Sequence, residues 1–258
     1  MNDQIEQQRN HFNDISARYS EARSHPNHLL LKDLIWSNFF ADKGYLAESC
    51  GRVLEPMCGM AEGYQILSRY LRQDLDYRGF DYSENMVEIA RKLHRGLRIE
   101  WQDVTTFAAP APEFDMIILI GGLHHVFSKS KEVISRLSGA LKLGGHFLSF
   151  EPTHNSWLNR VIRNRIYTRN ELFDSDTEQG FDFEELDAMF VDEGYRKVDQ
   201  VFAGLSAYVL YYNPDAFPGL NLGGALGVRM TFSLDRLFWR TLIGRKFAFA
   251  TITLWKRL

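Results

Sequence analysis

The sequence is poor in the features that mark several classes of protein. It has 2 Cys and 7 Pro in 258 residues, too few for a disulfide scaffold or a proline-rich low-complexity chain. Its net charge of -3, with 45% hydrophobic residues, excludes an intrinsically disordered chain. Its longest apolar run, Met116 to Leu123, is far shorter than the ~20 residues that cross a bilayer. These absences leave a globular protein of one elaborated domain or two small ones.

The charge pattern and the chain start indicate the compartment and the partners. The opening MNDQIEQQRNHFND is polar and lacks the apolar core of a signal peptide, so we expect a cytoplasmic protein with reduced thiols. The pI near 6.2 argues against nucleic-acid binding, which needs a basic face. Between Gly219 and Leu258, however, 7 Lys and Arg accompany a single acid, Asp235. We interpret this stretch as a solvated face, with contact to an anionic substrate or a membrane surface as the less favoured alternative.

Short apolar runs alternate with helical stretches after the first forty residues. Asn27 is predicted to cap a helix from about His28 to Ala41. Strands are predicted at Arg52–Met57, Tyr77–Tyr82, Arg98–Asp103, Phe114–Gly121 and His146–Glu151. Helices are predicted at Ala61–Arg72, Ser83–His94 and Lys129–Leu141, the last ending at Gly144-Gly145. This alternation predicts an α/β protein with a parallel sheet and helices on both faces.

The alternation breaks after Pro152. Two excursions, 153–180 and 213–244, carry amphipathic segments that we expect to form lid helices over Ser156–Ile166 and Ser233–Ile243. A helix is predicted at Phe183–Gly194 with Asp182 as its cap, a long strand or two strands over Val198–Tyr212, and a final strand over Phe247–Trp255.

Acidic residues and glycines follow the predicted strands. Ligands of open α/β sheets bind beyond the carboxyl ends of the strands, so these residues are the candidates for a site. Glu55 and Gly59 follow the first strand, where the chain turns into a helix. Asp81 ends the second strand, roughly 20 residues after the glycine turn, which suits a ribose diol. Asp103 can accept a hydrogen bond from a base amine after the third strand, and Gly121 opens the loop after the fourth.

In this order, five stretches resemble class I S-adenosylmethionine-dependent methyltransferases. They are VLEPMCGMAEG, GFDYSENMVEIAR, WQDV, FDMIILIGGLHHV and LKLGGHFLSFEP, within about residues 50–152. The resemblance implies a three-layer, doubly wound, Rossmann-like sheet of seven strands in the order 3-2-1-4-5-7-6, with the last strand antiparallel. We expect one domain over 1–258, with an N-terminal helical cap at 1–45, a cofactor-binding half at 46–152 and an acceptor-binding half at 153–258 that includes the lid insertions 153–180 and 213–244.

The resemblance also implies the cofactor, S-adenosyl-L-methionine, and the residues that bind it. Glu55 and Gly59 would hold the methionine part, Asp81 the ribose hydroxyls and Asp103 the adenine amine, with Tyr82, Met86 and the Val104 backbone beside the adenine. Gly121 would line the path to the sulfonium, and Tyr19 would belong to an N-terminal lid. Met57 and Ala61 stand where the family's loop has its first and third glycines, so only Gly59 remains.

Methyl transfer from a sulfonium is an in-line displacement, which an enzyme promotes mainly by alignment and exclusion of water. A hydroxyl nucleophile also needs a base, and histidine is the usual one near pH 7. The candidates are His124 and His125 after the fourth strand, Glu151 at the end of the fifth, and His154 just beyond it. No metal site is predicted, because neither cysteine has a CxxC partner.

The favoured interpretation is therefore a methyltransferase that acts on an oxygen, nitrogen or carbon of a small, partly apolar or anionic acceptor. The altered glycine loop motivates one alternative, a cofactor-binding regulatory or scaffold protein of the same fold. A nicotinamide-dependent oxidoreductase is a further alternative, disfavoured because the sequence lacks the G-x-G-x-x-G fingerprint.

Overall fold

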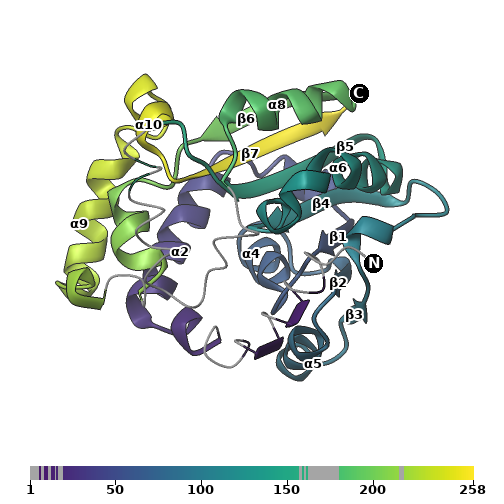
Figure 1. The fold of residues 1–258 in the computed structure, drawn as a ribbon, viewed down its shortest axis with the longest axis horizontal. Helices are drawn as coiled ribbons and strands as arrows, with labels where there is room; N and C mark the ends of the chain where they lie inside the picture. Colours follow the sequence, from purple (N-terminus) through teal and green to yellow (C-terminus); the bar gives the residue numbers. More distant parts are fainter. Residues whose placement is uncertain are drawn as a thin grey trace.

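The computed structural model describes residues 6, 9–10, 13–14, 16, 20–156, 159, 161, 180–214 and 218–258. Its centre is a seven-stranded sheet in the order β3-β2-β1-β4-β5-β7-β6 (Figure 1). Strands β1 to β5 pair in parallel, and β7 runs antiparallel to both β5 and β6. This arrangement confirms the predicted strand order and the antiparallel last strand.

The elements have the following bounds. The strands are β1 (Arg52–Pro56), β2 (Asp76–Asp81), β3 (Arg98–Trp101), β4 (Phe114–Ile120), β5 (Leu141–Pro152), β6 (Tyr195–Val201) and β7 (Ala250–Arg257). Between strands lie α4 (Glu62–Tyr70), α5 (Glu84–Leu93), η1 (Val104–Thr106), η2 (Leu123–Lys129), α6 (Ser130–Ala140) and α8 (Phe183–Asp192). Helices α2 (Pro26–Phe40) and α3 (Leu46–Ser49) precede β1, and η3 (Tyr208–Tyr212), η4 (Pro218–Leu220), α9 (Gly224–Arg236) and α10 (Leu242–Phe247) lie between β6 and β7.

Strand β4 shows why the sheet is buried on both sides. Met116 and Ile118 enter one buried cluster, which includes residues of α2, α4 and α9. Ile117 and Leu119 enter the other, with residues of α6 and α8. Successive side chains of a strand point to opposite faces, so a continuous apolar run supplies both clusters.

Three local predictions were wrong. Helix α6 ends at Ala140, and the Gly144-Gly145 pair lies inside β5, where a Cβ on Gly145 would stand 2.9 Å from the Asp115 carbonyl oxygen. The strand predicted through Tyr212 ends at Val201, and the apolar run that follows is helical, since apolar runs without alternation do not distinguish the two. The cap of α2 is His25 rather than Asn27.

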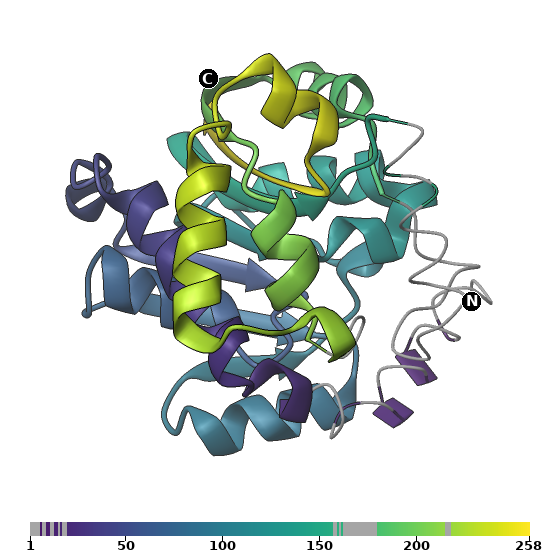
Figure 2. The ribbon, with the colours of Figure 1, turned by 90° about the vertical axis from the view of Figure 1, so that its left-hand side faces the viewer.

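The N-terminal cap helix is joined to the second half of the chain. Helix α9 runs alongside α2 (Figure 2), and the buried Lys43, just after α2, lies 2.8 Å from an Asp199 carboxylate oxygen on β6. Arg240 also pairs with Asp199. Burial opposes ionisation of Asp199, but the hydrogen bonds from Arg240 and Lys43 outweigh it and lower its pKa to about 2. Ion pairs of Asp199 with Lys43 and Arg240 therefore connect the region after α2 to the second half of the chain.

Most of the first predicted lid, including the helix over Ser156–Ile166, lies outside the described residues. The second lid is two helices, α9 and α10, instead of one over Ser233–Ile243. Among the described helices, none has both the length and the apolar character that crossing a membrane requires.

Candidate functional site

The loop after β1 has a glycine-type backbone at two positions without glycine. Met57, Gly59 and Ala61 have φ angles of 52°, 50° and 60°. The left-handed region costs an ordinary residue roughly 1–2 kcal/mol. Ala61 nevertheless precedes α4 as its N-cap residue. The replacement of two glycines has therefore left the loop in a glycine-type conformation, and the surrounding structure must hold it there.

Glu55 at the end of β1 fixes the far end of this loop. Its Oε1 accepts the Gly63 backbone N–H at 2.7 Å, and its Oε2 accepts the Tyr64 N–H at 3.0 Å and the Tyr77 hydroxyl at 2.7 Å. Burial raises the pKa of Glu55 to about 7, although all three hydrogen bonds favour the carboxylate. Glu55 thus anchors the start of α4, while its predicted role toward the methionine part of a cofactor stays a prediction.

Asp81 at the end of β2 fixes the middle of the loop. One carboxylate oxygen accepts the Gly59 N–H at 2.8 Å, and the other accepts the Ser83 N–H at 2.9 Å. Burial raises the pKa of Asp81. Each carboxylate oxygen has a second lone pair, so Asp81 can hold the loop and also accept a ligand hydroxyl. Ser83 caps α5, because its hydroxyl oxygen accepts the Met86 N–H at 3.2 Å.

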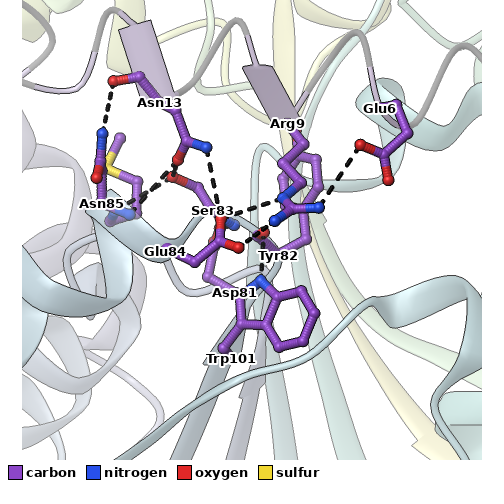
Figure 3. Close-up of polar contacts among 10 residues, drawn as sticks. Glu6, Arg9, Asn13, Asp81, Tyr82, Ser83, Glu84, Asn85 and Trp101 are labelled. Carbon is purple, nitrogen blue, oxygen red and sulfur yellow. Dashed lines mark hydrogen bonds and ion pairs between the residues drawn. The ribbon is translucent and has the colours of Figure 1, made fainter.

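Two described residues near the N-terminus, Arg9 and Asn13, lie at this end of the sheet close to Asp81 (Figure 3). Arg9 pairs with Glu84 through two nitrogens, and its guanidinium lies 5.3 Å from the centroid of the Trp101 ring. The Trp101 ring nitrogen in turn donates to the Tyr82 carbonyl oxygen at 2.8 Å. These contacts place Arg9 over the ends of β2 and β3.

Asn13 makes the second contact of this segment. Its side-chain oxygen accepts the Ser83 hydroxyl at 2.6 Å, and its carbonyl oxygen accepts the Asn85 side-chain amide at 2.9 Å (Figure 3). The sequence interpretation missed Arg9 and Asn13, because no local pattern marks a partner about seventy residues away. The predicted lid residue Tyr19 lies outside the described residues.

Asp103 follows β3 and keeps one oxygen available. Its Oδ1 accepts the Thr105 N–H at 2.8 Å and the Thr105 hydroxyl at 2.9 Å. Its Oδ2 has no hydrogen-bond partner within the described part of the chain. Of the side chains predicted beside the adenine, Val104 and Met86 are buried and Tyr82 is half-buried. The free oxygen suits the predicted bond to an adenine amine.

Glu151 organises the loop after β4. Its Oε1 accepts the N–H groups of Gly122 and Leu123, each at 3.0 Å, and its Oε2 lies 3.2 Å from His124 Nδ1. Burial raises the pKa of Glu151 to about 7, although the two backbone bonds favour the charged form. The rings of His124 and His125 lie 3.9 Å apart, and His125 is the more exposed of the two. Three of the four predicted catalytic candidates are therefore brought together.

The fourth candidate, His154, lies beyond β5, where its backbone N–H donates to the Phe181 carbonyl oxygen at 3.0 Å. Gly121, predicted to line the path to the sulfonium, has φ 61° and donates its N–H to the Phe150 carbonyl oxygen at 2.7 Å. In the part of the chain that the structure covers, no group of His, Cys, Asp and Glu side chains is arranged to hold a metal ion.

A second polar cluster, which includes His28, borders the loop after β1. His28 is 1% exposed, and its Nδ1 lies 2.6 Å from the Tyr212 carbonyl oxygen. A carbonyl only accepts, so Nδ1 carries the proton and Nε2 keeps a lone pair. Burial, followed by the charge of Arg23, lowers the pKa of His28 to about 3, so the ring is neutral at pH 7. Arg23 donates to the same carbonyl oxygen at 2.8 Å.

Glu62 links this cluster to the loop. It is the first residue of α4, and its Oε1 lies 2.9 Å from Lys32 Nζ and 3.5 Å from the Tyr212 hydroxyl. Burial opposes ionisation, but Lys32 leads the cations that lower the net pKa of Glu62. The Tyr212 ring packs 5.7 Å from Phe150, the neighbour of Glu151 on β5. The cluster thus lies at the same end of the sheet as the carboxylates.

Two glycines leave room for a ligand. A Cβ on Gly59 would meet nothing within 4 Å, and one on Gly121 would meet only His124 Cε1, at 3.6 Å. By contrast, a Cβ on Gly63 or Gly122 would stand under 3.0 Å from a neighbouring side chain. The Gly59 backbone therefore faces open space and Gly121 is not crowded, which fits a cofactor that lies against the loop.

The left-handed backbone at Ala61 can be tested by substitution. We expect Ala61→Gly to change the free energy of unfolding by less than about 1 kcal/mol, since relieved strain offsets glycine's entropy and the lost methyl contact. Ala90→Gly is the control, because Ala90 is equally buried but helical, and it should cost about 2 kcal/mol. Urea unfolding measures both, and equal losses would contradict the left-handed conformation.

Comparison with known proteins agrees with this geometry. Residues 53–145 match the model of a family described as a methyltransferase domain. No curated protein is similar enough in sequence to match. Similar solved structures include magnesium protoporphyrin IX methyltransferase of Synechocystis with bound S-adenosylhomocysteine, at 14% identity, TM-score 0.61 and coverage of 97% of this chain and 98% of that one.

Two other solved structures share the fold. A SAM-dependent methyltransferase from Archaeoglobus fulgidus is 14% identical, with TM-score 0.58 and coverage of 92% of this chain and 96% of that one. The cyclase SpnF is 16% identical, with TM-score 0.57 and coverage of 86% and 79%. At these identities the likeness establishes the fold, and this fold also occurs in a [4+2]-cyclase.

Proposed function

We propose that this chain, which carries a class I S-adenosylmethionine-dependent methyltransferase domain, moves the methyl group to an oxygen, nitrogen or carbon of a small, partly apolar or anionic acceptor. The observation that carries the proposal is the row of Glu55, Asp81 and Asp103 at the ends of β1, β2 and β3, beside a loop whose backbone faces open space. S-adenosylmethionine supplies an electrophilic sulfonium methyl when bound.

Two residues of this row, Asp81 and Asp103, bind different parts of the adenosine. Asp81 binds the ribose hydroxyls while it holds the Gly59 backbone in place. Asp103 accepts the adenine amine through its free oxygen. Arg9 and Asn13 cover this part of the site from the N-terminal segment. Their contacts pre-order the adenosine end, which leaves the sulfonium toward Gly121 and the histidine loop.

The acceptor side is supported by the second polar cluster. His28 presents an unprotonated Nε2, and the cations Arg23 and Lys32 flank it. The aromatic rings of Phe150 and Tyr212 pack beside it. A neutral imidazole next to cations and aromatic rings suits an acceptor with a hydroxyl or amine on an apolar or anionic body. His125 is the favoured base, because it is more exposed than His124.

The experiment that tests the function has two stages. Calorimetry should show binding of S-adenosylmethionine and S-adenosylhomocysteine, and no binding of nicotinamide cofactors. Mass spectrometry should then detect a gain of one methyl group in a panel of phenols, amines, lipids and sugar phosphates. Absence of cofactor binding would overturn the proposal, while binding without turnover on any acceptor would favour a regulatory protein of this fold.

A substitution at His28 tests the acceptor side separately. His28→Asn places an amide where Nδ1 donates to Tyr212 but removes the Nε2 acceptor, so we expect kcat/KM for the acceptor to fall about tenfold. The affinity for S-adenosylmethionine should not change. The control is His146→Asn, at the other end of β5, which should leave both constants unaltered. Equal kinetics in the two variants would remove His28 from the acceptor site.

A further inference from the structure

Helices α9 and α10 expose an unusual amount of apolar surface. On α9, Leu226, Met230 and Leu234 recur every four residues along one face. The exposed members of this surface, from the two helices and the turn between them, are Leu226 (69%), Met230 (61%), Leu234 (62%), Leu237 (70%), Leu242 (82%) and Ile243 (55%). Both helices stand at the same end of the molecule in Figures 1 and 2. We call these six side chains the α9–α10 surface.

Helix α9 exposes these apolar side chains although the helix itself is packed against the rest of the protein. The opposite side of α9 is packed, with Val228 and Phe232 buried in the core cluster that also contains α2. The Asp235 carboxylate, also buried, accepts the backbone N–H of Ala207. The helix is therefore anchored by one apolar face while a second apolar face points to solvent, where it has no role in holding the fold.

Positive charge borders the α9–α10 surface. Arg229 and Lys246 are exposed, and neither forms an ion pair within the described residues. The only acid between residues 218 and 258 is Asp235, which is buried. Glu184 of α8 is exposed and pairs with Arg245 of α10 at 3.5 Å, which leaves Arg229 and Lys246 without an ion pair in this part of the described structure. Apolar side chains beside unpaired cations are typical of helices that lie in the interface of an anionic bilayer.

A second copy of the chain fits this surface less well. In a twofold interface the same patch meets itself, so Arg229 and Lys246 of one copy would approach the same cations of the other. Like charges placed together in this way oppose association. An anionic lipid surface instead receives the apolar side chains among its acyl chains and the cations at its headgroups.

We propose that the α9–α10 surface docks this protein on membranes that contain anionic lipid. The surface belongs to α9, whose buried side packs on α2, and α2 carries His28 and Lys32 of the acceptor-side cluster. Docking would therefore place the acceptor side of the molecule next to the bilayer. The proposal concerns binding to lipid and does not depend on the methyl transfer proposed above.

Sedimentation with vesicles tests the docking. The full chain should sediment with vesicles of equimolar phosphatidylcholine and phosphatidylglycerol, and much less with phosphatidylcholine alone. High salt should weaken the binding, because it screens the cations. The double variant Arg229→Gln/Lys246→Gln should lower the partition coefficient by roughly thirtyfold, because each cation near an anionic surface contributes about 1 kcal/mol of attraction.

The triple variant Leu226→Gln/Met230→Gln/Leu234→Gln should lower the partition coefficient at least about tenfold, since glutamine retains helix propensity but not apolar burial. Leu93→Gln/Leu143→Gln is the matched control, with exposed leucines on α5 and β5 away from α9, and should bind like the parent. Unchanged cofactor binding in calorimetry would show that each variant is folded.

The docking proposal would be overturned if the parent does not bind the vesicles. It would also be overturned if binding survives in both the double charge variant and the triple apolar variant. Analytical ultracentrifugation in which the parent is a dimer and the triple variant a monomer would overturn it as well, because the surface would then join two copies. Loss of methyl transfer in vesicle-free solution would count against the proposed function and leave the vesicle result as it stands.

Discussion

Asp81→Ala is expected to weaken binding of S-adenosylmethionine by about 100-fold. The substitution would remove the proposed charge-assisted hydrogen bonds to the ribose hydroxyls, and it removes the acceptor of the Gly59 N–H. It should also lower the free energy of unfolding by about 2–4 kcal/mol, because the buried N–H groups of Gly59 and Ser83 lose their acceptor. Calorimetric titration and urea unfolding give the two values.

Asp76→Ala is the matched control for Asp81. Asp76 begins the same strand, but it is exposed and pairs only with the surface residues Arg52 and Arg98. Exposed ion pairs contribute about 0–1 kcal/mol, so this variant should keep both its stability and its cofactor affinity. If Asp81→Ala binds the cofactor as tightly as Asp76→Ala, the carboxylate does not contact the ribose.

Glu151→Ala is expected to lower the free energy of unfolding by about 3 kcal/mol and to abolish methyl transfer. The change leaves two buried N–H groups without an acceptor and frees the loop that carries His124 and His125. Glu151→Gln separates positioning from charge. Both N–H groups bond Oε1, so the amide oxygen can keep them while the amide nitrogen faces His124.

Glu151→Gln should therefore retain most of the stability that Glu151→Ala loses. Retained turnover in the Gln variant would assign Glu151 to positioning, whereas lost turnover with an intact fold would make it the base. Ser149→Ala, two residues earlier on the same face of β5, is the control, because its hydroxyl makes only a long 3.5 Å contact and both measurements should stay near the parent.

The pH dependence of stability follows from the same carboxylate. The folded-state pKa of Glu151 is about 7, above the ordinary 4.5, so the folded protein binds the proton more tightly than the unfolded chain. Its contribution to the free energy of unfolding should then fall as pH rises from about 4.5 to about 7, by on the order of 3 kcal/mol for such a group. Glu55 has the same sign, whereas His28, whose pKa is lowered to about 3, has the opposite sign up to about pH 6.5. The difference in stability between the parent and Glu151→Gln isolates the Glu151 contribution, and a difference that does not fall as pH rises over this range would contradict the burial of Glu151.

The strand-end carboxylates show how far sequence reasoning extends. Glu55, Asp81, Asp103 and Glu151 each lie at or just after the end of a predicted strand, and parallel strands bring their carboxyl ends to one edge of the sheet. Position along the chain was therefore enough to gather them. The same reasoning failed beyond Val201, where the aromatic run up to Tyr212 fits a strand and a helix equally well.

In the loop after β1 the sequence and the structure give different information. Met57 and Ala61 stand where the resembling family has glycines, but a residue type alone does not reveal its φ angle. Only the folded structure shows that both take the left-handed conformation. Hydrogen bonds from the Gly59 and Gly63 N–H groups to Asp81 and Glu55 compensate the local strain, and those bonds join the loop and the start of α4 to the ends of β2 and β1.

By itself the sequence determined the first five strands, the row of acidic residues and the loop after β4, because each depends on patterns a few residues long. The strand order was implied by the family resemblance that these patterns carry. The tertiary structure alone decided the Arg9–Glu84 contact, the cluster of His28 with Tyr212 and the outward direction of Leu226, Met230 and Leu234. Helix α9 is apolar on two sides, so its periodicity cannot select the buried one. That choice is made by packing against α2, which lies almost two hundred residues earlier in the chain.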